Sequence, residues 1–147
     1  MEPNDMQIGG SHYRKKYQHW DWVCDTRMPY LLACATKYVS RHQDKNGIED
    51  LLKATHYLTK AESRSIYMPR NKWWEFPLLG LTFEKLIRAR TLLFTNQLET
   101  KEASIIRLII GGSYDRANDQ IAELIDDITF PKVDKDYTNQ DPDYIRG

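Results

Sequence analysis

The sequence is poor in cysteine and in long apolar runs, and both shortages narrow the class of protein. Its 147 residues include two cysteines, Cys24 and Cys34. Both lie in segments of helical apolar periodicity, so we expect buried free thiols, as in a reducing cytosol, rather than a disulfide. No apolar run reaches the ~18 residues of a membrane span. The start at 1–5 is polar and acidic, so we do not expect it to be a signal peptide. A cytoplasmic protein is expected.

The standard phosphate-binding and zinc-binding motifs are also missing. Residues 9–11 and 111–113 both read Gly-Gly-Ser, but neither continues into a Walker loop, and no Gly-x-Gly-x-x-Gly occurs. There is no Cys-x-x-Cys, and neither His42 nor His56 has a second His three or four residues away, so a structural zinc site is not expected. Any phosphate site must therefore consist of side chains rather than of a backbone loop.

The formal net charge of zero conceals an asymmetry between the two halves of the chain. Residues 1–72 hold twelve Lys/Arg and eight Asp/Glu, a balance of +4, whereas residues 73–147 hold nine and thirteen, a balance of −4. An anionic ligand is therefore expected on the first half. The excess of positive charge is too small to favour duplex DNA, so nucleic acid is not an expected partner.

Strand-like alternation is nearly absent, and helical periodicity dominates the first half. A short helix is expected from Trp20 to about Thr26. Pro29 suits the first turn of a longer helix, and a turn at 44–47 separates this helix from another, so that the two form a hairpin. The apolar stripes that predict the hairpin are Leu31, Ala35, Tyr38 and His42 in its first helix and Ile48, Leu51, Leu52, Thr55 and Leu58 in its second.

Three further helices are expected in the second half. The first runs from Thr82 to about Leu98. Thr100 caps the next, although the apolar run 105–110 is also compatible with a buried strand. Ser113 is a natural N-cap for the last helix. The protein is therefore expected to be mostly α, with no extensive sheet.

The expected organisation is a helix hairpin module followed by a C-terminal helical bundle. An aromatic connector, which contains Trp73 and Trp74, separates them, and a flexible acidic tail ends the chain. The expected boundaries are 1–64 for the module, 65–81 for the connector, 82–130 for the C-terminal helical region and 131–147 for the tail.

Cations and aromatic residues gather in the hairpin. Lys37 and Arg41 are four residues apart and share a helix face, while Lys45 lies in the turn and Lys53 lies one turn into the second helix. Such a cluster binds phosphate through charge-assisted hydrogen bonds, and a nearby aromatic ring can stack on a base. The rings available for this are those of Tyr13, Trp20 and Tyr38. Composition alone favours a solvated helix face instead.

Two carboxylates and one histidine each have a functional and a structural interpretation. Glu49 and Asp50 are candidate Mg²⁺ ligands, since Mg²⁺ in proteins takes one or two carboxylates together with substrate phosphates. The same residues in the first turn of a helix also compensate the helix dipole. His12 is a candidate for proton transfer or phosphate binding, or is structural.

Three motifs at characteristic spacing resemble a known family. They are Ser11-His12-Tyr13, then Lys37-Tyr38-x-x-Arg41, and then the stretch 49–57, which reads Glu-Asp-Leu-x-Lys-Ala-x-x-Tyr. Over about residues 8–60 the chain resembles a small phage protein family commonly described as a nucleotide kinase or as a domain of unknown function. The first description comes from an oligomeric enzyme of short-tailed coliphages that phosphorylates deoxynucleoside monophosphates without a Walker loop.

The resemblance implies a homo-oligomeric nucleotide-binding phage protein in the cytoplasm of an infected bacterium. As a kinase it would use ATP and Mg²⁺, and its charged residues would neutralise the transferring phosphoryl group. The catalytic candidates are His12, Glu49 and Asp50, of which Glu49 and Asp50 are also the metal candidates. The ligand-binding candidates are Ser11, Tyr13, Lys37, Tyr38, Arg41, Lys45, Lys53 and Tyr57.

Three other functions remain open at this stage. The module could sequester a host signalling nucleotide without catalysis, through the same cationic site. The acidic second half could instead inhibit a host enzyme by imitating nucleic acid. An all-α nucleoside-triphosphate pyrophosphatase is less well supported, because it needs a denser acidic cluster than Glu49, Asp50 and Glu62 provide.

Overall fold

The computed structural model describes residues 17–69 and 83–131, and within these ranges all regular structure is helical. The expected mostly α class is confirmed. Among the described residues, no helix combines the length and the apolar character needed to cross a membrane. The elements are α1 (His19–Asp25), α2 (Tyr30–Arg41), the short 3₁₀ helix η3 (His42–Asp44), α3 (Ile48–Ser63), α4 (Phe83–Thr95), α5 (Thr100–Ile110) and α6 (Tyr114–Thr129).

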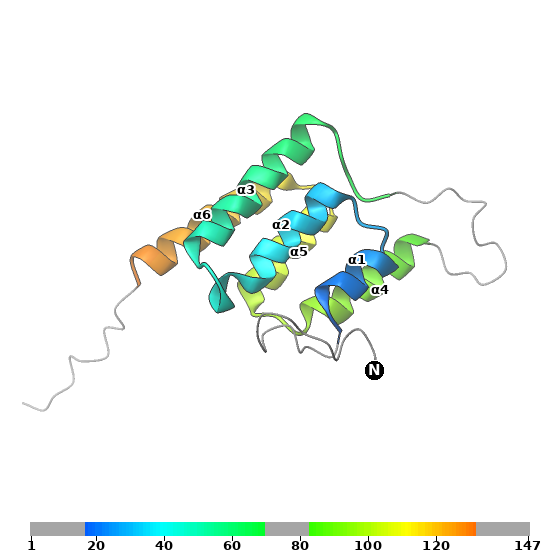
Figure 1. Cartoon of the computed structure of the whole chain (residues 1–147), viewed down its shortest axis with the longest axis horizontal. Helices are drawn as coiled ribbons and strands as arrows, with labels where there is room; N and C mark the ends of the chain where they lie inside the picture. Colours follow the sequence, from blue (N-terminus) through cyan, green and yellow to red (C-terminus); the bar gives the residue numbers. More distant parts are fainter. Residues whose placement is uncertain (1–16, 70–82, 132–147) are drawn as a thin grey trace, which may run out of the picture.

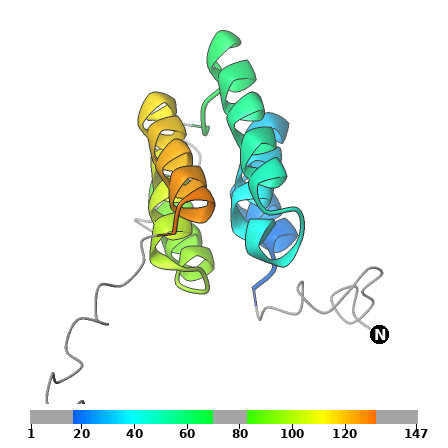
Figure 2. The same cartoon turned by 90° about the vertical axis from the view of Figure 1, so that its left-hand side faces the viewer.

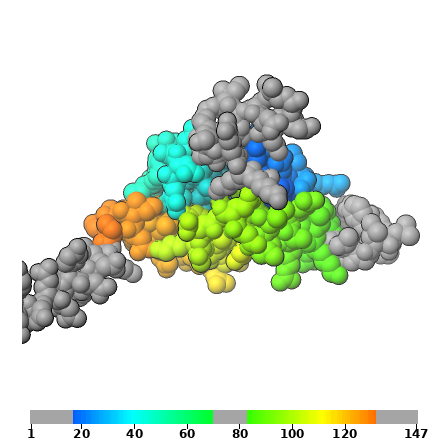
Figure 3. Space-filling view, turned by 90° about the horizontal axis from the view of Figure 1, so that it is seen from below, coloured from blue at the N-terminus to red at the C-terminus, as the bar shows by residue number. Residues whose placement is uncertain are grey.

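The six α-helices of the described residues form two layers (Figure 1). The first layer holds α1, α2 and α3, and the second holds α4, α5 and α6; the two layers are seen edge-on in Figure 2. Each helix of the first layer packs on one helix of the second, α1 on α4, α2 on α5 and α3 on α6. In the space-filling view the green to orange second layer lies against the blue and cyan first layer (Figure 3). The predicted module and the predicted C-terminal region therefore share one core.

Trp22 joins the layers where α1 meets α4. Its side chain is fully buried and its ring stacks on that of Phe94, with the ring centroids 4.4 Å apart. The Trp22 Nε1 donates a hydrogen bond to Thr91 Oγ1 at 3.3 Å, so the buried indole keeps a polar partner. Apolar side chains continue this core between the other helix pairs: Leu32, Ala35, Val39, Leu51, Ala54, Leu58, Ile105, Ile106, Ile109 and Ile121.

The run 105–110 is helical, which settles the choice left open by its composition. Glycine at the end of α5 explains the abrupt stop. Gly112 has a φ of +77°, its N–H donates to Ile109 O, and the N–H of Ser113 donates to Leu108 O. This is a Schellman end, in which a left-handed glycine satisfies the last carbonyls of the helix. A Cβ at Gly112 would also lie 3.1 Å from the Tyr67 ring, a contact so tight that the ring would have to shift, so glycine suits this position for a second reason.

Several helix limits differ slightly from the predicted ones. Pro29 is the N-cap of α2 rather than part of its first turn, and Glu99 precedes the helix that Thr100 was expected to cap. Ser113 does occupy the N-cap position of α6, but its side chain makes no capping hydrogen bond. The parts of the predicted connector and tail at 70–81 and 132–147 lie outside the described residues.

Some predictions of burial are wrong. Cys24 is exposed and Cys34 is half-buried, although both are free thiols as expected. Leu52 is 57% exposed, because the face of α3 that meets the core is centred on Leu51 and Leu58. The next residue along a helix lies about 100° further round, which turns Leu52 to solvent.

Candidate functional site

Tyr38 lies at the centre of a group of side chains contributed by α2 and α3. Its ring stacks on the Tyr57 ring at a centroid distance of 5.7 Å and an interplanar angle of 20°. The Arg41 guanidinium lies 4.7 Å from the centroid of the Tyr38 ring, and the Lys53 Nζ lies 5.8 Å from it. Both distances are typical of cation–π contacts. We refer to Tyr38, Arg41, Lys53 and Tyr57 as the aromatic–cation cluster.

Helical spacing explains why the cations of this cluster lie away from the core, whereas Tyr38 and Tyr57 are half-buried and pack against its edge. Arg41 follows the buried Leu32 by nine positions, which is about two and a half turns, so the two side chains leave α2 on opposite sides. On α3, Lys53 and Tyr57 are four residues apart and therefore share a face. The cluster thus lies on the outer side of the first layer, opposite the second layer.

Arg41 is also held by a buried carboxylate. The Arg41 Nε donates to Asp50 Oδ2 at 3.0 Å, and its Nη2 lies 3.5 Å from Oδ1. The Asp50 side chain is fully buried, and Asn46 Nδ2 donates to the same Oδ1 at 3.3 Å. Asp50 therefore ties the end of α2 to the start of α3 and fixes the direction of the Arg41 side chain.

Lys53 pairs with Glu49, one turn before it on α3. Its Nζ donates to Glu49 Oε1 at 2.5 Å, and this hydrogen bond raises the pKa of Lys53, which keeps the ammonium charged. Both side chains are well exposed, by 40% for Lys53 and 66% for Glu49. Exposed pairs of this kind contribute little to stability and exchange readily with other ions.

Lys37 and Lys45 are the remaining predicted phosphate ligands, and both are exposed. Lys37 directly precedes Tyr38 on α2, and Lys45 lies in the turn before α3. Among the described residues, neither side chain makes a hydrogen bond or an ion pair. Both ammonium groups are therefore available to an anionic ligand.

His19 lies close enough to these cations to respond to their charge. Its Nε2 lies 2.9 Å from Thr36 Oγ1, and its ring meets the Trp22 and Phe94 rings edge-on. Burial, reinforced by the positive charges of Lys37 and Arg41, lowers the pKa of His19 to about 3. The imidazole is therefore neutral near pH 7. Apart from the density of aromatic and charged residues around His19, no sequence pattern indicates this buried, neutral imidazole.

The structure brings together only some of the predicted site residues. Ser11, His12 and Tyr13 lie outside the described residues. Glu49 and Asp50 are sequence neighbours, but their carboxylates bind different cations, Lys53 and Arg41 respectively. In 17–69 and 83–131, no three His, Cys, Asp or Glu side chains are grouped so that they could hold a metal ion. The Mg²⁺ assignment to Glu49 and Asp50 stays a prediction.

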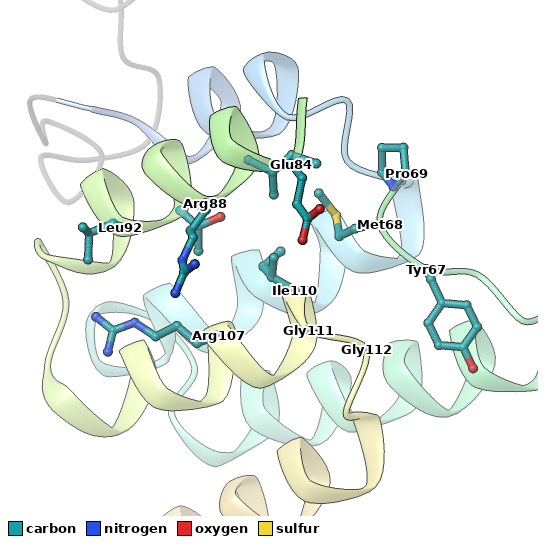
Figure 4. A pocket seen from close by; sticks show the side chains of 12 residues that line it. Tyr67, Met68, Pro69, Glu84, Arg88, Leu92, Arg107, Ile110, Gly111 and Gly112 are labelled. Atoms are coloured by element: carbon teal, nitrogen blue, oxygen red, sulfur yellow. The ribbon is translucent and has the colours of Figure 1, made fainter. Parts of the chain in front are cut away.

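A cleft of about 940 Å³ opens in the second layer, between α4 and α5 (Figure 4). Arg88 from α4 and Arg107 from α5 line it together with apolar side chains. No sequence pattern indicates this cleft. Apolar periodicity identifies the side of each helix that enters the core, whereas a hollow on the surface depends on how far two helices diverge.

A second feature without a sequence signal links the two layers at the end of α2. Glu102 of α5 is buried, and its Oε1 accepts a hydrogen bond from Gln43 Nε2 at 2.7 Å and lies 3.4 Å from His42 Nε2. The His42 Nδ1 lies 2.9 Å from Val39 O. These contacts place a polar connection within the interface and anchor the turn that precedes α3.

Residues 9–59 match the model of a domain family described as a protein of unknown function, DUF3310. No curated protein and no solved structure matches the chain. The match agrees with the expected domain of unknown function at about residues 8–60 and adds nothing to the nucleotide-kinase description. The matched stretch contains the whole aromatic–cation cluster, whereas the residues that line the α4–α5 cleft lie beyond its end.

Proposed function

We propose that the protein binds a phosphorylated small molecule, in particular a nucleotide, on the outer side of α2 and α3. The observation that carries the proposal is the Tyr38 ring, which stacks on Tyr57 and has a guanidinium and an ammonium group within 6 Å of its centroid. A surface that offers aromatic rings beside cations suits a ligand with a flat base and a phosphate. Tyr30 extends the aromatic surface along the same face of α2 and is 72% exposed.

The cations of this surface differ in how firmly a carboxylate holds them, and therefore in how readily they can bind a phosphate. Lys37 and Lys45 are exposed, and Lys53 is held by an exposed carboxylate that a phosphate can replace at small cost. Arg41 is bound to the fully buried Asp50, and breaking such a pair is costly. The lysines are therefore the phosphate ligands in this proposal, while Arg41 supplies positive charge from a fixed position.

The resemblance to the phage family extends the proposal to a deoxynucleoside monophosphate kinase. ATP would be the phosphoryl donor and Mg²⁺ would lie near Glu49, with the lysines neutralising charge on the transferring group, since phosphoryl transfer depends mainly on positioning and electrostatics. The second candidate is nucleotide binding without catalysis. It is favoured by one arrangement: each of the two candidate metal ligands already binds a cation of the cluster.

Binding is tested by the melting temperature of the protein with a panel of nucleoside mono-, di- and triphosphates, followed by calorimetric titration of any that raise it. We expect Lys53→Gln to weaken the affinity for the best nucleotide by roughly tenfold, the loss of one charge-assisted contact. Lys101→Gln is the matched control, because Lys101 is also an exposed lysine paired with a carboxylate, that of Asp127 in the second layer.

Two results would contradict the proposal. One is a panel in which no nucleotide raises the melting temperature. The other is an equal loss of affinity in Lys53→Gln and Lys101→Gln, because this would show that the overall charge of the protein decides binding rather than the surface of α2 and α3.

A further inference from the structure

The α4–α5 cleft has the size and lining of a small-molecule site. Its volume of about 940 Å³ falls within the range of roughly 300–1,000 Å³ that such sites occupy. Ile87 of α4 and Ile110 of α5 give it apolar walls, and Met68 closes it from the segment that follows α3. Figure 4 shows Met68 and Ile110 beside this hollow. None of the residues that line it belongs to the aromatic–cation cluster.

Two arginines from different helices bring positive charge into this apolar hollow. Arg88 lies on α4 and Arg107 on α5, and Figure 4 shows both side chains extending into the space between the two helices. Arg107 Nη2 donates to Thr95 Oγ1 at 3.3 Å, a contact with a neutral hydroxyl. Arg88 has no hydrogen-bond or ion-pair partner within 17–69 and 83–131. Neither guanidinium is thus neutralised by a carboxylate of the described chain.

This local charge is notable because the surrounding half of the sequence is acidic. Residues 73–147 carry nine Lys/Arg against thirteen Asp/Glu. Two arginines in one cleft, neither with a carboxylate partner among the described residues, run against this overall balance. Glu84 also lines the cleft, one turn before Arg88, but forms no ion pair with it. An anion that enters the cleft would gain two guanidinium partners without displacing a carboxylate of the residues that the structure describes.

We propose that the cleft between α4 and α5 is a second ligand site, which takes an organic anion with an apolar or aromatic body. The body lies between the apolar walls, and a carboxylate or phosphate group accepts hydrogen bonds from Arg88 and Arg107. The planar guanidinium suits both headgroups, because its parallel N–H groups match two oxygen atoms of either one. This site is independent of the proposed nucleotide surface, since the two share no residue.

Three probes with the same ring test the proposal on the full chain: 1-naphthoate, 1-naphthyl phosphate and uncharged 1-naphthol. Binding is followed by NMR of isotope-labelled Ile and Met methyl groups, with Ile110 and Met68 as reporters of the cleft. We expect at least one of the two anions to shift both methyl signals and to bind roughly tenfold more tightly than naphthol. The stronger of the two anions identifies the headgroup that the cleft prefers.

Charge variants then assign the contact. Arg88→Gln and Arg107→Gln are each expected to weaken binding of the preferred anion by roughly tenfold and to leave naphthol binding unchanged. Glu84→Gln removes a negative charge from the same cleft and is expected to strengthen anion binding. Arg116→Gln is the matched control, because Arg116 is an exposed arginine on α6, away from the cleft.

The proposal is overturned if naphthol binds as tightly as both anions, if no probe shifts the Ile110 and Met68 signals, or if Arg116→Gln weakens binding as much as Arg88→Gln. Lys53→Gln separates this site from the nucleotide surface. Anion binding that depends on Lys53 but not on Arg88 belongs to the surface of α2 and α3, and it too would overturn the assignment to the cleft.

Discussion

Arg41 and Asp50 bind each other, with the Arg41 Nε 3.0 Å from Asp50 Oδ2. From the sequence, Arg41 was expected to bind a phosphate and Asp50 to hold a metal ion or to catalyse. In the structure the pair fixes the corner between α2 and α3, because the Asp50 side chain is fully buried and the Arg41 side chain is only 18% exposed. Both expectations stay predictions. A ligand on this surface therefore meets an arginine that is already oriented.

The buried pair is expected to matter more for stability than its exposed neighbour. Arg41→Met should lower the free energy of unfolding by roughly 2 kcal/mol, because the buried Asp50 carboxylate loses its charged donor. Chemical denaturation near pH 7 measures this loss. Lys53→Met is the control, since it breaks an exposed pair and should change stability little. An equal loss of unfolding free energy in the two variants would show that the burial of Asp50 does not determine how much the pair stabilises the fold.

His19 predicts a loss of stability in mild acid. The folded chain keeps His19 neutral down to about pH 3, whereas the unfolded chain protonates it near the ordinary pKa of about 6.5. The unfolded state binds more protons between these two values. Stability should therefore fall as the pH drops below about 6.5, by up to about 1.4 kcal/mol per pH unit from this residue.

Denaturation at pH 7.5 and pH 5 measures this dependence. His19→Gln should make stability less dependent on pH, because glutamine does not titrate in this range and still offers a partner to Thr36. His56→Gln, which changes an exposed histidine of α3, should keep the wild-type slope. A His19→Gln protein with an unaltered slope would disprove the role of His19.

A substitution of Glu49 distinguishes a protein that only binds nucleotide from one that also transfers a phosphoryl group. Without metal, Glu49→Gln should strengthen nucleotide binding a few-fold, because Lys53 is released from its partner and a negative charge leaves the surface. If Glu49 holds Mg²⁺, the same variant should lose formation of nucleoside diphosphate from ATP and a deoxynucleoside monophosphate. Calorimetry with and without Mg²⁺, together with analysis of the products, covers both points. Wild-type protein that binds nucleotide tightly and forms no diphosphate would rule out the kinase and leave the binding protein.

Tyr114 is expected to stabilise the junction between α6 and the segment that follows α3. Its hydroxyl donates to Ile66 O at 2.6 Å, and its ring stacks on Tyr67. Tyr114→Phe should lower the free energy of unfolding by about 1 kcal/mol near pH 7, the usual contribution of one such hydrogen bond. Burial raises the pKa of Tyr114 to about 12, so its phenolate absorbance near 295 nm should appear late in an alkaline titration and be missing from the variant. Tyr30→Phe, at an exposed tyrosine, is the control.

Most helices could be predicted because large apolar residues repeat at about 3.6 positions in each of them. The error at Leu52 has a specific cause. Ala54 and Ala61 complete the buried side of α3. Because alanine is only weakly apolar, the larger Leu52 was included in the predicted apolar stripe although it lies on another side of the helix. The packing of the layers could not be predicted, because it depends on contacts such as that of Trp22 with Phe94, which are distant in sequence.

For the candidate site, too, the features within one helix could be predicted and the contacts between helices could not. Spacing within the two helices of the hairpin was enough to group Arg41 with Lys53, and Tyr38 was named as a ring that could stack on a base. Tyr57 was named only through the family motif, and its stacking on Tyr38 was not predicted. Which carboxylate meets which cation was not predictable, because it depends on the register of the hairpin. The α4–α5 cleft leaves no local pattern at all, since Arg88 and Arg107 belong to different helices.

The packing of the two layers also shows that the matched stretch has an apolar side that it cannot cover by itself. Residues 9–59 supply most of one layer, and that layer turns Trp22, Leu32 and Leu58 towards α4, α5 and α6. In this chain the second layer does for the matched stretch what a partner subunit does in a dimer. A protein that carried the first layer without α4, α5 and α6 would have to cover the same apolar side with another copy of itself or with a different chain.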